Sequence, residues 1–176
     1  FKALLFLSAG SVIHAMHHEQ DMRKMGGLFK KIPFTATMMW IGSLAIIGFP
    51  YLSGYYSKES ILENAFYASN GIAYFAYLVG ILTALLTAFY SWRLLFLTFH
   101  GENRSNNKTY DHAHESPLVM TVPLFILAIG SVFSGIFFAD YFIGYYKKEF
   151  WNTALILTHS SHNYLPFTQS LVSKCA

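Results

Sequence analysis

The hydrophobic run that decides the fold is IAYFAYLVGILTALLTAFYSWRLLFLTF, residues 72–99. Its only charged residue is Arg93, near its end. A helix needs roughly 20 apolar residues to cross the hydrocarbon core of a bilayer, and this run exceeds that length. We expect Arg93 to extend its guanidinium towards the nearer water interface. The run therefore predicts a membrane-spanning helix.

The composition of the whole chain agrees with a membrane protein. Of the 176 residues, 54% are hydrophobic, 18% are aromatic and only 12% are charged. Soluble domains carry roughly 25% charged residues, because their surfaces must be solvated. Nucleic acid is excluded as a partner, because the basic residues lie mainly at the ends of hydrophobic runs instead of forming one stripe. The single cysteine, Cys175, excludes an internal disulfide and a thiolate metal site made by this chain alone.

Three further apolar segments lie around the first one. They begin at Phe1, at Pro33 and at Leu118, and end near Met16, Ala68 and Tyr145. The sequence thus predicts an all-α fold of polytopic transmembrane helices. Residues 1–145 form the transmembrane region, with about four helices, and residues 146–176 form a polar or amphipathic tail. The apolar run at 153–158 in that tail is too short to span a bilayer.

The segment that begins at Pro33 is too long for one crossing. Roughly 35 residues give a straight helix of about 50 Å, whereas the hydrocarbon core is about 30 Å thick. Gly48, Pro50 and Gly54 cluster near its middle, and a proline removes a backbone donor and clashes with the preceding turn. We therefore expect one discontinuous helix with a break between two helical parts.

The polar loops predict the orientation of the helices. The loops at 17–33 and 101–117 lie on the same side, since the chain crosses the membrane and returns between them. They hold most of the basic residues, which favours the cytoplasmic or matrix side. The turn near Asn70 and the tail then face the opposite side.

Lys58 is the strongest candidate for chemistry, because it follows the break in an otherwise membrane-like segment. Charged groups at such depth are costly and usually face a hydrated cavity with a function. The alternative is a lysine that snorkels to the interface, and counting residues from Pro33 favours a position near the far face. Glu59 and Glu63 are four residues apart and share a helix face, which suits a proton relay. The alternative is an ordinary helix start with Ser57 as N-cap.

Two residues of the first segment are also candidates. Lys2 is intramembrane if the helix begins upstream, and interfacial if the chain begins at Phe1. We expect the segment to be the second part of a longer helix, from a longer protein. His14 lies near the end of the segment, where it can pass protons or bond a carbonyl.

Histidines gather in both polar loops, as His17–His18 and as His112 with His114. Adjacent side chains on a helix point in different directions, and neither group matches a spaced zinc motif. We expect no metal site, and no Gly-rich nucleotide-binding loop is present.

Several motifs, in order, resemble one family. They are FKALLFL (1–7), GSVIH (10–14), HHEQD (17–21), RKMGGL (23–28), GYYSKE (54–59), FHG (99–101) and HESP (114–117). They are similar to subunit 5 of NADH:ubiquinone oxidoreductase (respiratory complex I), called subunit L in bacteria. The related antiporter-like subunits and the Mrp-type sodium/proton antiporters share the first motif and a version of RKMGGL. The HHEQD run resembles subunit 5 in particular.

The resemblance implies part of an antiporter-like fold and a proton-translocating role. Lys58 falls on the family's lysine at the second broken helix, and Lys2 on its central-axis lysine, while Glu59 replaces a more usual aspartate. With His14, these are the expected proton-translocation residues. The implied partners are other complex I membrane subunits, the missing upstream part of the subunit, and the lipid of a mitochondrial inner or bacterial plasma membrane. NAD, FMN, iron–sulfur clusters and quinone belong elsewhere in the complex, so no cofactor is expected on this chain.

Two alternative functions stay open. An Mrp-type cation/proton antiporter subunit would transport sodium without NADH oxidation, although HHEQD speaks against it. A non-functional truncated membrane scaffold would tolerate substitution of Lys2 and Lys58.

Overall fold

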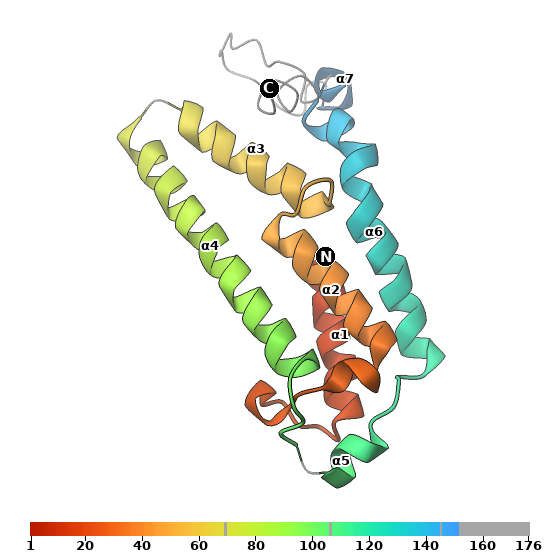
Figure 1. The fold of residues 1–176 in the computed structure, drawn as a ribbon. Helices are drawn as coiled ribbons and strands as arrows, with labels where there is room; N and C mark the ends of the chain where they lie inside the picture. The colour runs from red at the N-terminus through yellow and green to blue at the C-terminus, as the bar shows by residue number, and fades with distance from the viewer. Residues whose placement is uncertain (69, 106, 145, 152–176) are drawn as a thin grey trace. The chain divides into compact units, whose positions relative to one another are not determined.

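The computed structural model describes residues 1–68, 70–105, 107–144 and 146–151. Every regular element in these ranges is helical, which confirms the predicted all-α fold. Their order is α1 (Lys2–Ala15), the 3₁₀ turns η1 (Met22–Lys24) and η2 (Leu28–Lys30), α2 (Pro33–Ile47), α3 (Ser53–Tyr67), α4 (Gly71–Phe99), α5 (Asn107–His112), α6 (Leu118–Phe142) and α7 (Lys147–Trp151) (Figure 1). The chain divides into two compact units, residues 1–135 and 136–176.

Two of these helices, α4 and α6, are long and apolar enough to cross a membrane. Their 29 and 25 residues correspond to about 43 and 37 Å at 1.5 Å per residue. Most of their large apolar side chains are exposed, as expected for surfaces that face lipid. α6 ends at Phe142, close to the predicted end of the fourth segment, and the amides of Ile143 and Gly144 both close onto the Ala139 carbonyl.

The predicted interruption is confirmed. The chain from Pro33 to Tyr67 forms two helices of 15 residues each, α2 and α3. Each is about 22 Å long, which is shorter than the hydrocarbon core of a bilayer. The chain therefore uses a pair of half-length helices where a single continuous helix would protrude.

The helices of the first unit pack through small residues. Gly42 of α2 faces α1, where an added Cβ would lie 2.9 Å from Leu5 Cγ. Gly80 of α4 approaches Leu62 of α3 in the same way, at 2.5 Å from its Cδ2. Glycines permit close approach of helices in lipid, where no hydrophobic effect drives association. A buried cluster that includes Leu28, Leu95 and Phe99 joins α4 to the polar loop after α1.

The two polar loops meet at the same end of the first unit, as predicted (Figure 1). Arg104 Nε donates to the Met25 carbonyl at 2.8 Å, and the Tyr110 hydroxyl donates to the Gly27 carbonyl at 3.0 Å. Gly27 has φ 66°, a left-handed conformation that suits glycine. The sequence did not predict α5, which lies inside the loop at 101–117. The side of the membrane that these loops face stays a prediction.

The second unit begins inside α6, after Gly135. Its described aromatic residues gather around Phe142, whose ring centroid lies 4.7 Å from that of Phe150. Trp151 Nε1 donates to the Phe142 carbonyl at 3.3 Å. The predictions for Cys175 and for the run at 153–158 fall outside the described residues.

Candidate functional site

The candidate site lies at the interruption between α2 and α3. Gly48 ends α2 in the left-handed conformation, with φ 95°, which a glycine adopts without steric cost. Its amide donates to the carbonyls of Leu44 and Ala45, both at 3.2 Å. Pro50, which has no amide to continue a helix, follows in the turn. The chain changes direction here before α3 begins at Ser53.

The first turn of α3 lies directly against the last turns of α2. Gly54 is buried, and a Cβ at this position would collide with the backbone carbonyl of Ala45. The added Cβ would also lie 3.7 Å from Cε1 of the Phe1 ring. A glycine thus brings together the end of α2, the start of α3 and the start of α1.

Lys58 lies at this junction, one helical turn after Gly54. Its Nζ donates to the Ile47 carbonyl at 3.3 Å, and the side chain is half-buried. Carbonyls in the last turn of a helix lack intrahelical partners and carry the partial negative charge of the helix dipole. The end of α2 therefore offers the Lys58 ammonium an acceptor and a partial negative charge at the break.

Lys2 lies at the start of α1, which reaches the same junction through Phe1. It is the first residue of α1 and follows Phe1, whose ring lies beside Gly54. Its side chain is exposed and forms no hydrogen bond or ion pair with the described residues. The structure therefore brings Lys2 and Lys58 to the same end of α1.

Glu59 is half-buried beside Lys58, and its Oε2 is shielded from solvent. Glu63 lies one turn further along α3 and is exposed, so the two carboxylates differ in environment. The alternative interpretation, with Ser57 as the N-cap, is wrong. α3 begins at Ser53, so Ser57 lies inside the helix and its hydroxyl donates to the Gly54 carbonyl at 3.2 Å.

His14 is separated from the other candidates. It lies in the last turn of α1, twelve residues after Lys2, which corresponds to about 18 Å along the helix. Its ring is exposed and makes no hydrogen bond with any described residue. The structure therefore supports neither a contact with Lys58 nor the alternative of a bond to a carbonyl.

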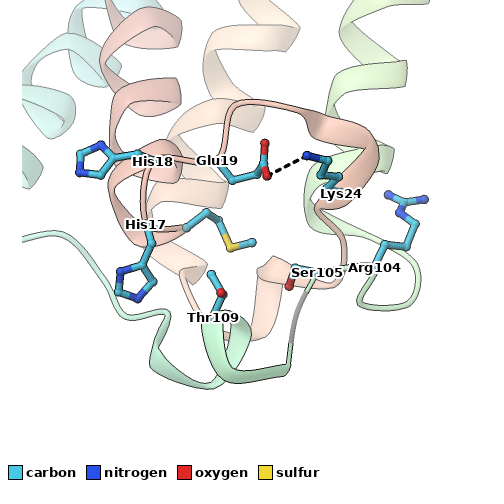
Figure 2. A pocket seen from close by; sticks show the side chains of 8 residues that line it. His17, His18, Glu19, Lys24, Arg104, Ser105 and Thr109 are labelled. Atoms are coloured by element: carbon cyan, nitrogen blue, oxygen red, sulfur yellow. Dashed lines mark hydrogen bonds and ion pairs between the residues drawn. The ribbon is translucent and has the colours of Figure 1, made fainter.

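A cavity of about 410 Å³ opens after the end of α1, between the two polar loops. Figure 2 shows the Glu19–Lys24 ion pair along one edge, at 3.3 Å, and the rings of His17 and His18 directed away from it. The amide of Asp21 and the Lys24 ammonium hold the pKa of Glu19 below its usual value. The cavity is lined by Met16, His17, His18, Glu19, Lys24, Arg104, Ser105 and Thr109. Its charged groups are engaged with one another or with backbone carbonyls, so they do not converge on a ligand.

The histidine groups do not assemble a metal site in the described ranges, where no three potential ligands come together. His17 and His18 both have positive φ, 51° and 69°, and their rings diverge. His114 Nδ1 lies 2.9 Å from the carbonyl oxygen of His112, within the same loop.

One residue that holds the start of α2 was quoted from the sequence only within the HESP motif and was given no contact there. Glu115 binds the first turn of α2 from a loop 80 residues further along the chain. The sequence does indicate that the start of α2 needs such a partner, because its N-cap residue, Ile32, has no side chain able to cap a helix. Such a helix start needs a partner from elsewhere, but the sequence alone does not say which residue it is.

Comparison with known proteins gives the family. Residues 1–87, which hold the break and all four predicted site residues, match the profile of the NADH:quinone oxidoreductase/Mrp antiporter transmembrane family. The chain is 54% identical to NADH-quinone oxidoreductase subunit L of Rhodobacter capsulatus, over 86% of this chain. The chain belongs to this family. Two more of its members are NADH-ubiquinone oxidoreductase chain 5 of Marchantia polymorpha, 50% identical over 89% of this chain, and of Allomyces macrogynus, 55% identical over 77%.

Family membership makes this chain a membrane protein and confirms the resemblance to the antiporter-like subunits. The chain spans only 22%, 23% and 21% of the length of these three relatives. The roles of Lys58, Lys2, Glu59 and His14 stay predictions.

Proposed function

We propose that this chain is part of a proton-translocating membrane subunit of NADH:quinone oxidoreductase. The proposal is supported by membership of the antiporter-like family together with the geometry of Lys58. A lysine at the break between two half-length helices, with its ammonium donating to the Ile47 carbonyl, can release a proton and, as the neutral amine, take one up again inside the membrane. This contact is the observation that carries the proposal.

The residues of the junction take different roles in this proposal. Lys58 holds the proton at the break, and Lys2 exchanges protons with it from the start of α1. Glu59, the next residue of α3, supplies a half-buried carboxylate near the break. His14, at the opposite end of α1, takes part in proton transfer on the side of the polar loops.

The proposal places the redox reaction on other subunits. NADH oxidation by quinone would drive translocation from outside this chain, so the partners are other membrane subunits of the complex, the rest of the subunit, and lipid. The membrane is one that carries a respiratory chain, either the mitochondrial inner membrane or a bacterial plasma membrane.

The test is Lys58→Ala in the full-length subunit, assembled in its complex and reconstituted in vesicles. We expect proton translocation per NADH oxidised to fall several-fold, because the ammonium at the break is lost. Lys30→Ala is the matched control, since Lys30 is an exposed lysine of the polar loop. A parental rate in Lys58→Ala would contradict the proposal and favour the scaffold. Sodium-dependent transport without NADH oxidation would favour the antiporter instead.

A further inference from the structure

The helix before the break has an unusual distribution of charge. α2 contains no Asp, Glu, Lys, Arg or His between Pro33 and Ile47. Its own N-cap residue, Ile32, provides no side-chain hydrogen bond, and its last turn holds no basic residue. Both ends are instead bound by charged side chains from other parts of the chain.

Glu115 binds the N-terminal end. Its Oε1 accepts a hydrogen bond from the Thr35 amide at 3.0 Å, and its Oε2 accepts one from the Phe34 amide at 3.3 Å. The Thr35 hydroxyl also donates to Oε1. Pro33 has no amide, so the carboxylate takes the two backbone donors that the first turn leaves unpaired before the Ala36 amide bonds to Ile32. Its negative charge also complements the positive end of the helix dipole.

The segment that carries Glu115 is itself held in place. Ala113 and Ser116, on either side of Glu115, are buried, with 6% and 8% of their surface exposed. Tyr110, in α5, bonds to the loop before α2 through Gly27. The carboxylate therefore has little freedom to follow α2 if the helix shifts.

Lys58 binds the opposite end of α2 through the Ile47 carbonyl. The 15 residues between these contacts form one continuous helix of about 22 Å. α2 is hydrogen-bonded from Pro33 to Ile47 with no internal proline, so a displacement of its first turn is carried along the helix towards its last carbonyl. One carboxylate and one ammonium thus hold opposite ends of the same helix.

We propose that Glu115 is a positioning residue for Lys58. The Glu115 carboxylate hydrogen-bonds the first turn of α2. It thereby keeps the Ile47 carbonyl where it accepts the hydrogen bond from the Lys58 ammonium. This role rests on the proposed function of Lys58 in proton transfer. It assigns a task to a loop residue that lies at the opposite end of α2 from the break.

The experiment separates charge from shape at this position. Glu115→Gln keeps the length of the side chain but removes its charge, whereas Glu115→Asp keeps the charge and shortens the side chain. Asp111→Asn is the matched control, because Asp111 is an exposed carboxylate of the same loop whose only ion pair in the described ranges is with Lys31, at 3.8 Å. All variants are made in the full-length subunit within the complex, together with Lys58→Ala.

Two readouts are taken from each variant. The first is hydrogen exchange of the Phe34 and Thr35 amides, and the second is proton translocation per NADH oxidised. We expect Glu115→Gln to speed the exchange about tenfold, since a charge-assisted bond is lost, and to slow translocation several-fold. Glu115→Asp should lie closer to the parent in both, while Asp111→Asn should match the parent.

Three results would overturn the proposal. Parental exchange and translocation in Glu115→Gln would mean that the charged carboxylate does not hold the first turn of α2. Faster exchange with parental translocation would mean that Glu115 stabilises the start of α2 without positioning Lys58. A greater loss in Glu115→Asp than in Glu115→Gln would make shape, and not charge, the cause.

Two further variants keep the test decisive. If Glu115→Gln does not assemble, Thr35→Val removes one of the three bonds to the carboxylate and should move both readouts in the same direction by a smaller factor. Parental values in Thr35→Val would then overturn the proposal. A parental translocation rate in Lys58→Ala would mean that the proposed function of Lys58 has failed. The exchange measurement would then report only whether Glu115 holds the first turn of α2.

Discussion

Gly135→Ala tests whether the start of α3 is fixed by packing against α6. Gly135 is buried, and an added Cβ would lie 2.8 Å from Ser53 Cα and 2.6 Å from Tyr56 Cδ2. Ordinary van der Waals contact begins at 3.4 Å, so the backbone at Ser53 must retreat by about 0.6 Å, the difference between 3.4 and 2.8 Å. Overpacking of this kind typically costs about 1–3 kcal/mol.

The displaced backbone leads directly to the candidate site. Ser53 is the first residue of α3, and Lys58 lies in the same helix with its ammonium at 3.3 Å from the Ile47 carbonyl. This distance is already long for an N–H to O bond, so a shift of about half an ångström breaks it. We therefore expect Gly135→Ala to lower both the stability of the subunit and its rate of proton translocation.

The assay is heat treatment of the full complex, followed by measurement of the subunit that stays assembled. Gly130→Ala on the same helix is the control, because an added Cβ at Gly130 meets no atom within 4 Å. Both substitutions gain about 0.5–1 kcal/mol of helix propensity over glycine, so their difference isolates the packing cost. Equal stability and equal translocation in the two variants would refute the packing argument.

Two further predictions concern the polar loops. Tyr110→Phe removes the hydrogen bond to the Gly27 carbonyl and should lower the stability of the subunit by about 0.5–1.5 kcal/mol in the same heat assay. Tyr74→Phe is the control, because the Tyr74 ring is exposed on α4, and should leave the stability unchanged. The hydrogen bond from Arg23 holds the pKa of Asp21 below its ordinary value of 3.8. Because the folded pKa is depressed, the stabilisation is present above 3.8 and is lost as the pH falls through the folded value. Protection of the Arg23 amide, corrected for intrinsic exchange, should persist at pH 4.5 and fall in stronger acid, whereas Asp21→Ala, which has no side-chain acceptor for that amide, should lack it at both. Protection that is independent of pH would contradict this ion pair.

The interruption in the second segment could be predicted from the sequence because its causes are local. Pro50 cannot donate a backbone hydrogen bond, and Gly48 adopts a left-handed conformation without steric cost. The length of the apolar run independently required a break. The place where α3 begins could not be predicted, since the contact between Gly54 and Ala45 allows the helix to start before Ser57.

The candidate site was predicted in part. Lys58 stood out because a charged residue in an apolar segment is visible in the sequence, and the structure places it at the break. The separation of His14 from Lys2 along one helix could be counted in the sequence, but the position of Lys58 at the Lys2 end of that helix could not, because it depends on the packing of α3 against α1 and α2. Glu115 was missed for a similar reason, as its acceptor role arises only when a distant loop meets the start of α2.

By itself, the sequence determined the class of protein, the two long apolar helices α4 and α6, and the existence of a broken helix. These properties follow from the apolar length and from the backbone chemistry of single residues, which act over one or two turns. Only the tertiary structure decided which groups meet, namely Lys58 with Ile47, Phe1 with Gly54, and Glu115 with Thr35. Such contacts join segments up to 80 residues apart, and they depend on helix packing through residues such as Gly42, which no local pattern reports.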